Sequence, residues 1–168
     1  MKRNIALLFL VSVAVLAGGH SKATAAPTAA AANLPPVNLA PAIVRAGAEN
    51  KLLLLEFGSS DSCPPCIEFQ RKVFSTPVFL AYEKSNLVFL RLDFPLKSEL
   101  RPDTQATNVL LAHQFDVYAY PTFIALDRQG KESWRIPPTG DLFPEIDTRL
   151  YQPENFIRLL EGVRTKQK

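Results

Sequence analysis

The sequence predicts an α/β domain in which a mixed sheet of about four to five strands is flanked by helices. Apolar runs of strand length alternate with segments whose apolar residues recur at helical spacing. Strands separated by helices favour parallel pairing through crossover connections. The turn DRQG at 127–130 lies between two apolar runs, which indicates an antiparallel hairpin at one edge. With 168 residues, 47% of them hydrophobic and 21% charged, the chain suits one globular domain.

The first 25 residues predict an export signal. Lys2 and Arg3 precede an apolar run at 5–17, and the small residues at 23–25 suit a cleavage site. The run is short for a membrane span of about 20 residues, and no cysteine directly follows it to carry a lipid anchor. We expect its removal to leave an exported, periplasmic or otherwise extracytoplasmic chain without stable membrane insertion. An uncleaved anchor is the alternative.

Removal of this segment changes the charge of the chain. The whole chain has 19 basic and 16 acidic residues and a formal net charge of +3. Residues 1–25 hold three of the basic residues and no acidic one, so 16 of each sign remain. The formal net charge is then zero, and no nucleic-acid partner is predicted. Export also places the cysteines in an oxidising compartment, where disulfides persist.

Residues 26–38 predict a flexible tether, because they open with the uncharged, Ala- and Pro-rich stretch APTAAAANLPP. The domain then covers residues 39–168. We expect a short helix from Pro41, with Ile43, Val44 and Ala46 on its apolar face.

The run KLLLLEF at 51–57 predicts a strand that is covered on both faces. After the cysteines, helical spacing predicts a helix with a break near Thr76, before Pro77. The next strand is NLVFLRLDF at 86–94, and residues 95–105, with two prolines and several charges, predict a loop.

The second half of the domain continues with TNVLLAHQF at 107–115, a short amphipathic helix. PTFIALD at 121–127 and residues 131–136 form the predicted hairpin. Residues 137–152, with three prolines, are expected to be irregular, and PENFIRLLEGVR at 153–164 predicts the closing helix.

The two cysteines, Cys63 and Cys66, stand where the first strand gives way to a helix. If Cys63 caps that helix, backbone N–H groups and the helix dipole lower the pKa of its thiol. Cys63 is then the attacking sulfur and Cys66 the resolving one. Pro64 suits the first helical position. Because Pro64 and Pro65 lack N–H groups, we expect a smaller lowering of this pKa than in the strongest oxidants.

Two further residues favour a chemical role. Glu56 is an acid inside an apolar strand, where burial is costly without a partner or a task. Exchanging a proton with Cys66 is one such task, and an ion pair with Lys51 or Lys72 is the alternative. Pro121 begins a strand, and a cis bond before it would bring backbone groups beside the dithiol, although sequence does not determine the isomer.

Three segments together resemble the thioredoxin superfamily: LLLLEFGSSDSCPPC, VFSTPVFLAYEKSNLVFLRLDFP and FDVYAYPTFIALDRQGK. The resemblance covers roughly residues 40 to 165 and is greatest to secreted bacterial thioredoxin-like proteins with an acid-F-x-G-S-D-W-C-x-x-C pattern. It implies a thioredoxin-like fold with Cys63 as nucleophile, Cys66 as resolving thiol and Glu56 as the buried acid. It also implies a cis-Pro121 beside the substrate groove, with Tyr120 contacting the substrate backbone.

The chain departs from the family pattern at four places. Ser62 replaces the aromatic residue usual before the first cysteine, Glu56 stands where Asp is commoner, and Ala119 replaces a frequent glycine. Residues 95–113 are longer than the corresponding link in a minimal thioredoxin. These departures bear on substrate choice and redox potential.

Other readings of the same residues remain open. A structural Cys63–Cys66 disulfide would close only a very short loop and stabilise little. A metal site, including a copper carrier, would have the two cysteines and His113 but too few further ligands. Trp134 suits the core or a groove wall, and Asp61 suits a turn or helix cap.

The sequence thus predicts an exported thiol-disulfide oxidoreductase that exchanges disulfides with protein substrates through Cys63 and Cys66. Pro64, Pro65 and Tyr120 would lie at the substrate surface with Pro121. The reducing direction is favoured, because the two prolines withhold donors from Cys63. No cofactor or metal is expected, and electrons would come from a redox partner protein, membrane-borne in an exported setting. The alternative is a non-catalytic thioredoxin-fold binding or chaperone module.

Overall fold

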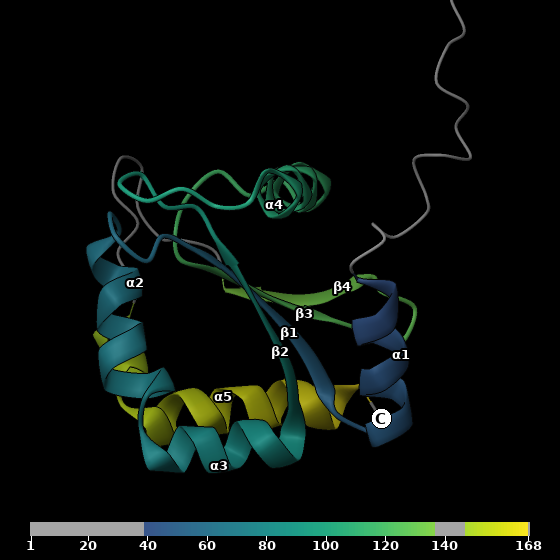
Figure 1. The fold of residues 1–168 in the computed structure, drawn as a ribbon. Helices are drawn as coiled ribbons and strands as arrows, with labels where there is room; N and C mark the ends of the chain where they lie inside the picture. Colours follow the sequence, from purple (N-terminus) through teal and green to yellow (C-terminus); the bar gives the residue numbers. More distant parts are fainter. Residues whose placement is uncertain (1–38, 137–146, 168) are drawn as a thin grey trace, which may run out of the picture. The chain divides into compact units, whose positions relative to one another are not determined.

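The computed structural model describes residues 39–136 and 147–167 (Figure 1). The predicted export signal at 1–25 and tether at 26–38 lie outside the described residues, as does much of the segment 137–152. Within the described ranges, no helix is both long and apolar enough to cross a membrane.

Helices and strands alternate along most of the described chain. The elements are α1 (Ala40–Glu49), β1 (Leu52–Gly58), α2 (Pro64–Phe69), the π-helix η2 (Gln70–Phe74), α3 (Pro77–Asn86), β2 (Leu87–Asp93), α4 (Pro102–Gln114), β3 (Thr122–Leu126), β4 (Glu132–Ile136), the 3₁₀-helix η3 (Thr148–Tyr151) and α5 (Pro153–Lys166).

The four strands of the described residues form one mixed sheet, as the sequence predicts, and their order is β2-β1-β3-β4. β1 and β2 are parallel, and β3 and β4 form the expected antiparallel hairpin. The prediction of parallel pairing through crossovers is wrong for β1 and β3, which are antiparallel. Asp93 and Thr122, which flank the α4 connection, pair with Gly58 and Phe57 at the same end of β1. The connection therefore begins and ends at one end of the sheet, so β3 must run back.

Both faces of β1 are buried, which confirms the prediction of a strand covered on both sides. Leu53, Leu55 and Phe57 belong to a core cluster that includes residues of α1 and α4. Leu52 and Leu54 belong to a second cluster with residues of α3 and α5. Figure 1 shows α3 and α5 lying along one side of the sheet and α4 on the other. By the alternation of a strand, Glu56 points to the second side.

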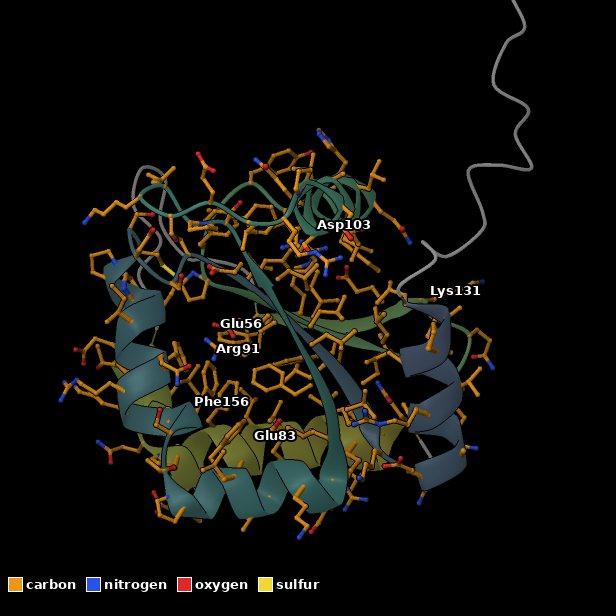
Figure 2. All side chains as sticks on the ribbon, in the orientation of Figure 1. Glu56, Glu83, Arg91, Asp103, Lys131 and Phe156 are labelled. Atoms are coloured by element: carbon orange, nitrogen blue, oxygen red, sulfur yellow. A yellow bond between two sulfur atoms is a disulfide. The ribbon has the colours of Figure 1, made fainter. Side chains whose placement is uncertain are left out.

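The second cluster is rich in aromatic rings. Phe156 of α5 lies under the sheet (Figure 2), with its ring centroid 5.4 Å from that of Phe69 and 5.2 Å from that of Phe123. The predicted helix break is confirmed: Thr76 caps α3 by accepting the Phe79 N–H at 3.4 Å, and Pro77 is the first helical residue.

Two helices differ from prediction. In α1, Ala42 and Ala46 face the core, whereas Val44 is 71% exposed. Residues four apart share a helix face and residues two apart do not, so Val44 was misplaced. α4 begins at Pro102, inside the segment predicted to be a loop. Proline suits the start of a helix because it lacks the N–H that would have no partner there.

Candidate active site

The sulfur atoms of Cys63 and Cys66 are bonded to each other at the start of α2. Cys63 is the N-cap of this helix, as predicted, and its Sγ accepts the Cys66 backbone N–H at 3.2 Å. Pro64 and Pro65 fill the two helical positions between them. Because an N-cap side chain accepts from the second or third helical N–H, Pro65 removes one donor and Cys66 supplies the other.

Both cysteines are largely covered. Cys63 is 8% exposed and Cys66 is 4% exposed, so Cys63 is the more accessible residue of the two. Pro64 is exposed beside it, and Pro65 is half-buried. A partner molecule that reacts with these cysteines must therefore have a surface that fits closely around Pro64.

Glu56 is buried, with 3% of its surface exposed, and forms an ion pair with an arginine that the sequence did not reveal as a site residue. Arg91 Nε donates to Glu56 Oε2 at 2.6 Å, and Figure 2 shows the two side chains directed toward each other. The expected alternative partners are wrong, since Lys51 pairs with Glu49 and Lys72 with Glu68.

Arg91 is itself held by two further side chains. Its guanidinium donates to Gln70 Oε1 and lies over the Phe74 ring, 5.2 Å from the centroid. The pair has a signal in the sequence, because Glu56 is the single charge of β1 and Arg91 is the charge inside β2, which ends at Asp93. The parallel register sets Glu56 and Arg91 opposite each other.

Burial raises the pKa of the Glu56 carboxyl above its ordinary value. The attraction and hydrogen bond of Arg91 oppose this rise, and the nearby negative charge of Asp93 adds to it. Burial is the largest of these effects, so the carboxyl binds its proton more tightly than an exposed glutamate would.

Gly58 lies next to both this carboxyl and the Cys66 sulfur. A Cβ atom at Gly58 would lie 3.3 Å from Cys66 Sγ and 3.4 Å from Glu56 Oε1. The sulfur and the carboxyl oxygen are therefore no farther apart than the sum of these distances. A side chain at position 58 would fill the space between them, so glycine keeps Cys66 and Glu56 open to each other.

A cleft of about 380 Å³ opens this space to the surface, and we call it the Glu56 cleft. Its lining comprises Glu56, Gly58, Ser59, Ser60, Cys66, Ile67, Gln70, Arg91, Leu92 and Asp93. The cleft has both the room and the polar partners that water needs. A proton could therefore pass between Cys66 and the Glu56 carboxyl through this space.

The Tyr120–Pro121 peptide bond is cis, and Pro121 is buried at the start of β3. Thr122 pairs with Phe57, so one step further along the antiparallel register Pro121 lies level with Gly58. Tyr120 is half-buried, and this burial raises the pKa of its hydroxyl. Its ring stacks on Phe94 with centroids 5.0 Å apart.

Asp61 does more than the turn residue that the sequence predicted. Its carboxylate accepts the N–H groups of Leu96, Lys97 and Ser98 at 2.8, 2.9 and 3.1 Å. These bonds hold the pKa of the Asp61 carboxyl down at about 2. They fasten the loop that carries Cys63 to the segment that follows β2. This contact has no local sequence signal, since its partners lie 35 to 37 residues away.

Within residues 39–136 and 147–167, no group of three or more His, Cys, Asp or Glu side chains is placed to hold a metal ion. His113 is exposed near the end of α4. Trp134 is half-buried and packs against the aromatic cluster, in agreement with the core or wall role expected for it.

Comparisons with known proteins match the region of the chain that contains this site. The model of the thioredoxin-like domain family matches residues 39–146, more than half of the chain. The disulfide bond reductase DsbH of Chlamydia pneumoniae is 29% identical over 107 residues, which are 64% of this chain and 64% of that relative. The chain thus spans less than two thirds of the relative's length. A solved structure of a DsbH oxidoreductase is similar in fold, with a TM-score of 0.62 and 21% identity, covering 74% of this chain and 79% of that one.

Proposed function

Since the chain belongs to the thioredoxin-like domain family, we propose that it is a thiol-disulfide oxidoreductase that acts on protein substrates through Cys63 and Cys66. One observation carries the proposal: Cys63 caps a helix, and Cys66, to which it is bonded, shares a solvent-open cleft with the buried Glu56 carboxyl. A bond that only held the loop closed would need neither the cleft nor the carboxyl.

The reduced form begins the exchange. The Cys63 thiolate attacks one sulfur of a substrate disulfide, so a Cys63–substrate disulfide forms and the other substrate sulfur leaves as a thiolate. The Cys66 N–H, which reaches the Cys63 sulfur in the structure, favours the thiolate before attack. The cis peptide at Pro121 and the ring of Tyr120 would meet the substrate backbone beside this sulfur.

The second step releases the substrate. The Cys66 thiol gives its proton to the Glu56 carboxylate through the Glu56 cleft, and the resulting thiolate attacks the Cys63 sulfur. The Cys63–Cys66 disulfide forms, and the substrate leaves as its second thiolate. Two electrons have then passed from the dithiol to the substrate. Glu56 returns its proton through the cleft, and Arg91 orients the carboxylate throughout.

Reduction is the direction that we favour. The fewer donors reach the Cys63 sulfur, the less its thiolate is stabilised and the more reducing the pair becomes. Pro64 and Pro65 leave only the Cys66 N–H at the sulfur. The name of the similar DsbH protein, a disulfide bond reductase, supports the same direction. A redox partner protein with its own dithiol would then reduce Cys63–Cys66 after each turnover.

The apolar start of the chain supports an exported location, periplasmic or otherwise extracytoplasmic. In that setting the redox partner would be membrane-borne, because electrons must come from the other side of the membrane.

A redox titration in glutathione buffers, with alkylation of free Cys63 and Cys66, tests the function. We expect a reversible midpoint between about −120 and −270 mV, the range of known exchange proteins. The Cys66→Ser variant, which retains one thiol, controls for simple glutathionylation. A pair that stays oxidised below about −300 mV would be a structural bond. The chain would then be a binding module.

A further inference from the structure

A second cavity, of about 600 Å³, adjoins the Glu56 cleft, with Asp93 in the wall of both. We call it the rim groove. It lies between the segment 94–102, the first turns of α4 and Tyr120. Its apolar lining includes Phe94, Pro95, Leu96, Leu100, Val109 and Tyr120. Its volume is within the range of ligand sites and is enough for more than one side chain.

The rim groove exposes apolar surface of a kind that a protein without a binding partner ordinarily buries. Leu96 is 83% exposed and Val109 is 41% exposed. Single exposed apolar residues are common, but apolar residues gathered around a hollow next to a reactive group mark a binding surface.

Charge narrows the choice of occupant. The groove lining contains the carboxylates of Asp93 and Glu99 and no lysine, arginine or histidine. Asp93 already accepts the N–H and hydroxyl of Ser60, at 2.8 and 2.7 Å. Glu99 is exposed at the edge. An occupant with a cationic side chain next to an apolar one would match both the wall and this edge.

The groove is fastened to the reactive loop. Asp61, two residues before Cys63, accepts the N–H groups of Leu96, Lys97 and Ser98, and its carboxylate also accepts the Ser98 hydroxyl at 3.2 Å. On the far side, Tyr120 lines the groove and precedes Pro121. The segment that forms the groove is therefore held at a fixed place relative to the cysteine that would bond the substrate.

We propose that the rim groove receives a bulky apolar side chain and a neighbouring cationic side chain from the substrate segment that carries the reactive cysteine, and that Asp61 is the positioning residue that holds the groove beside Cys63. This inference rests on the exchange function proposed above. It gives the chain a preferred substrate class, a cysteine flanked by an apolar and a basic residue, which the dithiol alone does not define.

Short peptides with one cysteine test the inference. Each cysteine is capped as a disulfide with 5-thio-2-nitrobenzoate, which is released as a coloured thiolate when Cys63 attacks the peptide sulfur. One peptide has Leu and Lys near the cysteine, a second Leu and Glu, and a third Ser at both positions. Capped glutathione serves as a substrate too small to reach the groove, and reaction with free dithiothreitol corrects for intrinsic reactivity.

The reduced protein should react with the Leu–Lys peptide about tenfold faster than with the Ser peptide at limiting concentration, through a lower KM. The Leu–Glu peptide should fall between them. Leu96→Ser removes an exposed apolar wall, and Asp61→Asn removes the charge that binds the segment 96–98. Both should lose most of the preference for the Leu–Lys peptide over the Ser peptide, with each peptide rate taken relative to the same variant's rate with capped glutathione. Leu80→Ser, the same change at an exposed leucine of α3, should keep the preference.

Equal rates with all three peptides, alongside a normal rate with capped glutathione, would overturn the groove while leaving the dithiol function intact. Equal preference for the Lys and Glu peptides would overturn the cationic half of the inference. A preference lost equally in Leu80→Ser would remove the role of the groove. Failure to release the coloured thiolate from any substrate would overturn the exchange function itself, so the two failures are distinguishable.

Discussion

Glu56 and Arg91 are direct partners in the register of two parallel strands, and their side chains meet at 2.6 Å beneath the sheet. The two partners differ sharply in exposure, since the side chain of Glu56 is 3% exposed and that of Arg91 is 44% exposed. The arginine can therefore stay hydrated while the carboxyl is buried. This asymmetry leaves the carboxyl with a raised pKa, close to the dithiol and connected to it by the Glu56 cleft.

The first prediction separates the two steps of exchange. In Glu56→Gln, attack by Cys63 should be unchanged, and release of the substrate by Cys66 should slow by roughly 100-fold, the usual contribution of a positioned base. Single turnover with capped glutathione measures both, since the coloured thiolate reports attack and free glutathione reports release. Glu83→Gln, on α3, is the control. Equal slowing of both steps would contradict a role for Glu56 in release.

The second prediction concerns stability and pH. The pKa of Glu56 is higher in the folded chain than its value of 4.5 without the fold. Glu56 therefore contributes its full stabilisation at pH values below 4.5, and this stabilisation is lost as the pH rises through the pKa of the folded chain. Glu56→Gln, neutral at every pH, should be more stable than the wild type at neutral pH and lose that advantage on acidification. Urea unfolding of both proteins at neutral and at acidic pH measures this difference in stability. A greater stability of Glu56→Gln that does not depend on pH would point to packing instead.

The sequence carries most of the fold but only part of the site. Strands such as 51–57 and the break before Pro77 follow from local rules, namely continuous apolar runs and the shape of proline. The direction of β3 and the Asp61 bonds to residues 96–98 depend on contacts between distant segments, which no local pattern encodes. The Glu56–Arg91 pair lies between these cases. Each charge is visible in its own strand, but the strand register selects the partner.

The third prediction tests Arg91 as the residue that keeps Glu56 ionised. Arg91→Gln removes the positive charge that opposes the effect of burial on Glu56, so the pKa of the Glu56 carboxyl should rise further. Release of substrate by Cys66 should slow about tenfold at neutral pH, and its pH profile should move to higher pH. Arg91→Lys, which keeps a cation, should restore part of the rate. Arg71→Gln, which removes a guanidinium on the exposed surface beside α2, should leave the profile in place.

A profile of Arg91→Gln with the same midpoint and only a lower plateau would contradict this reading. Arg91 would then act by holding Gln70 and the ring of Phe74 in place, and not through the charge on Glu56.

The last prediction uses the two prolines between the cysteines. An N-cap sulfur accepts from the second and third helical N–H groups, and these positions are Pro65 and Cys66. Pro65→Ala therefore restores a donor to the Cys63 thiolate, whereas Pro64→Ala restores an N–H at the first position, which does not face the cap. A hydrogen bond to a charged group is worth about 1.5 kcal/mol or more, and about 1.4 kcal/mol corresponds to 30 mV for a two-electron couple.

The glutathione midpoint of Pro65→Ala should therefore rise by roughly 30 mV or more, while that of Pro64→Ala stays near the wild type. The sign follows because a donor that stabilises the thiolate favours the reduced form and makes the pair more oxidising. Equal shifts in both variants would mean that helix flexibility, and not the missing N–H of Pro65, sets the potential. A shift in Pro65→Ala alone would mean that this single absent donor helps to set the potential of the pair.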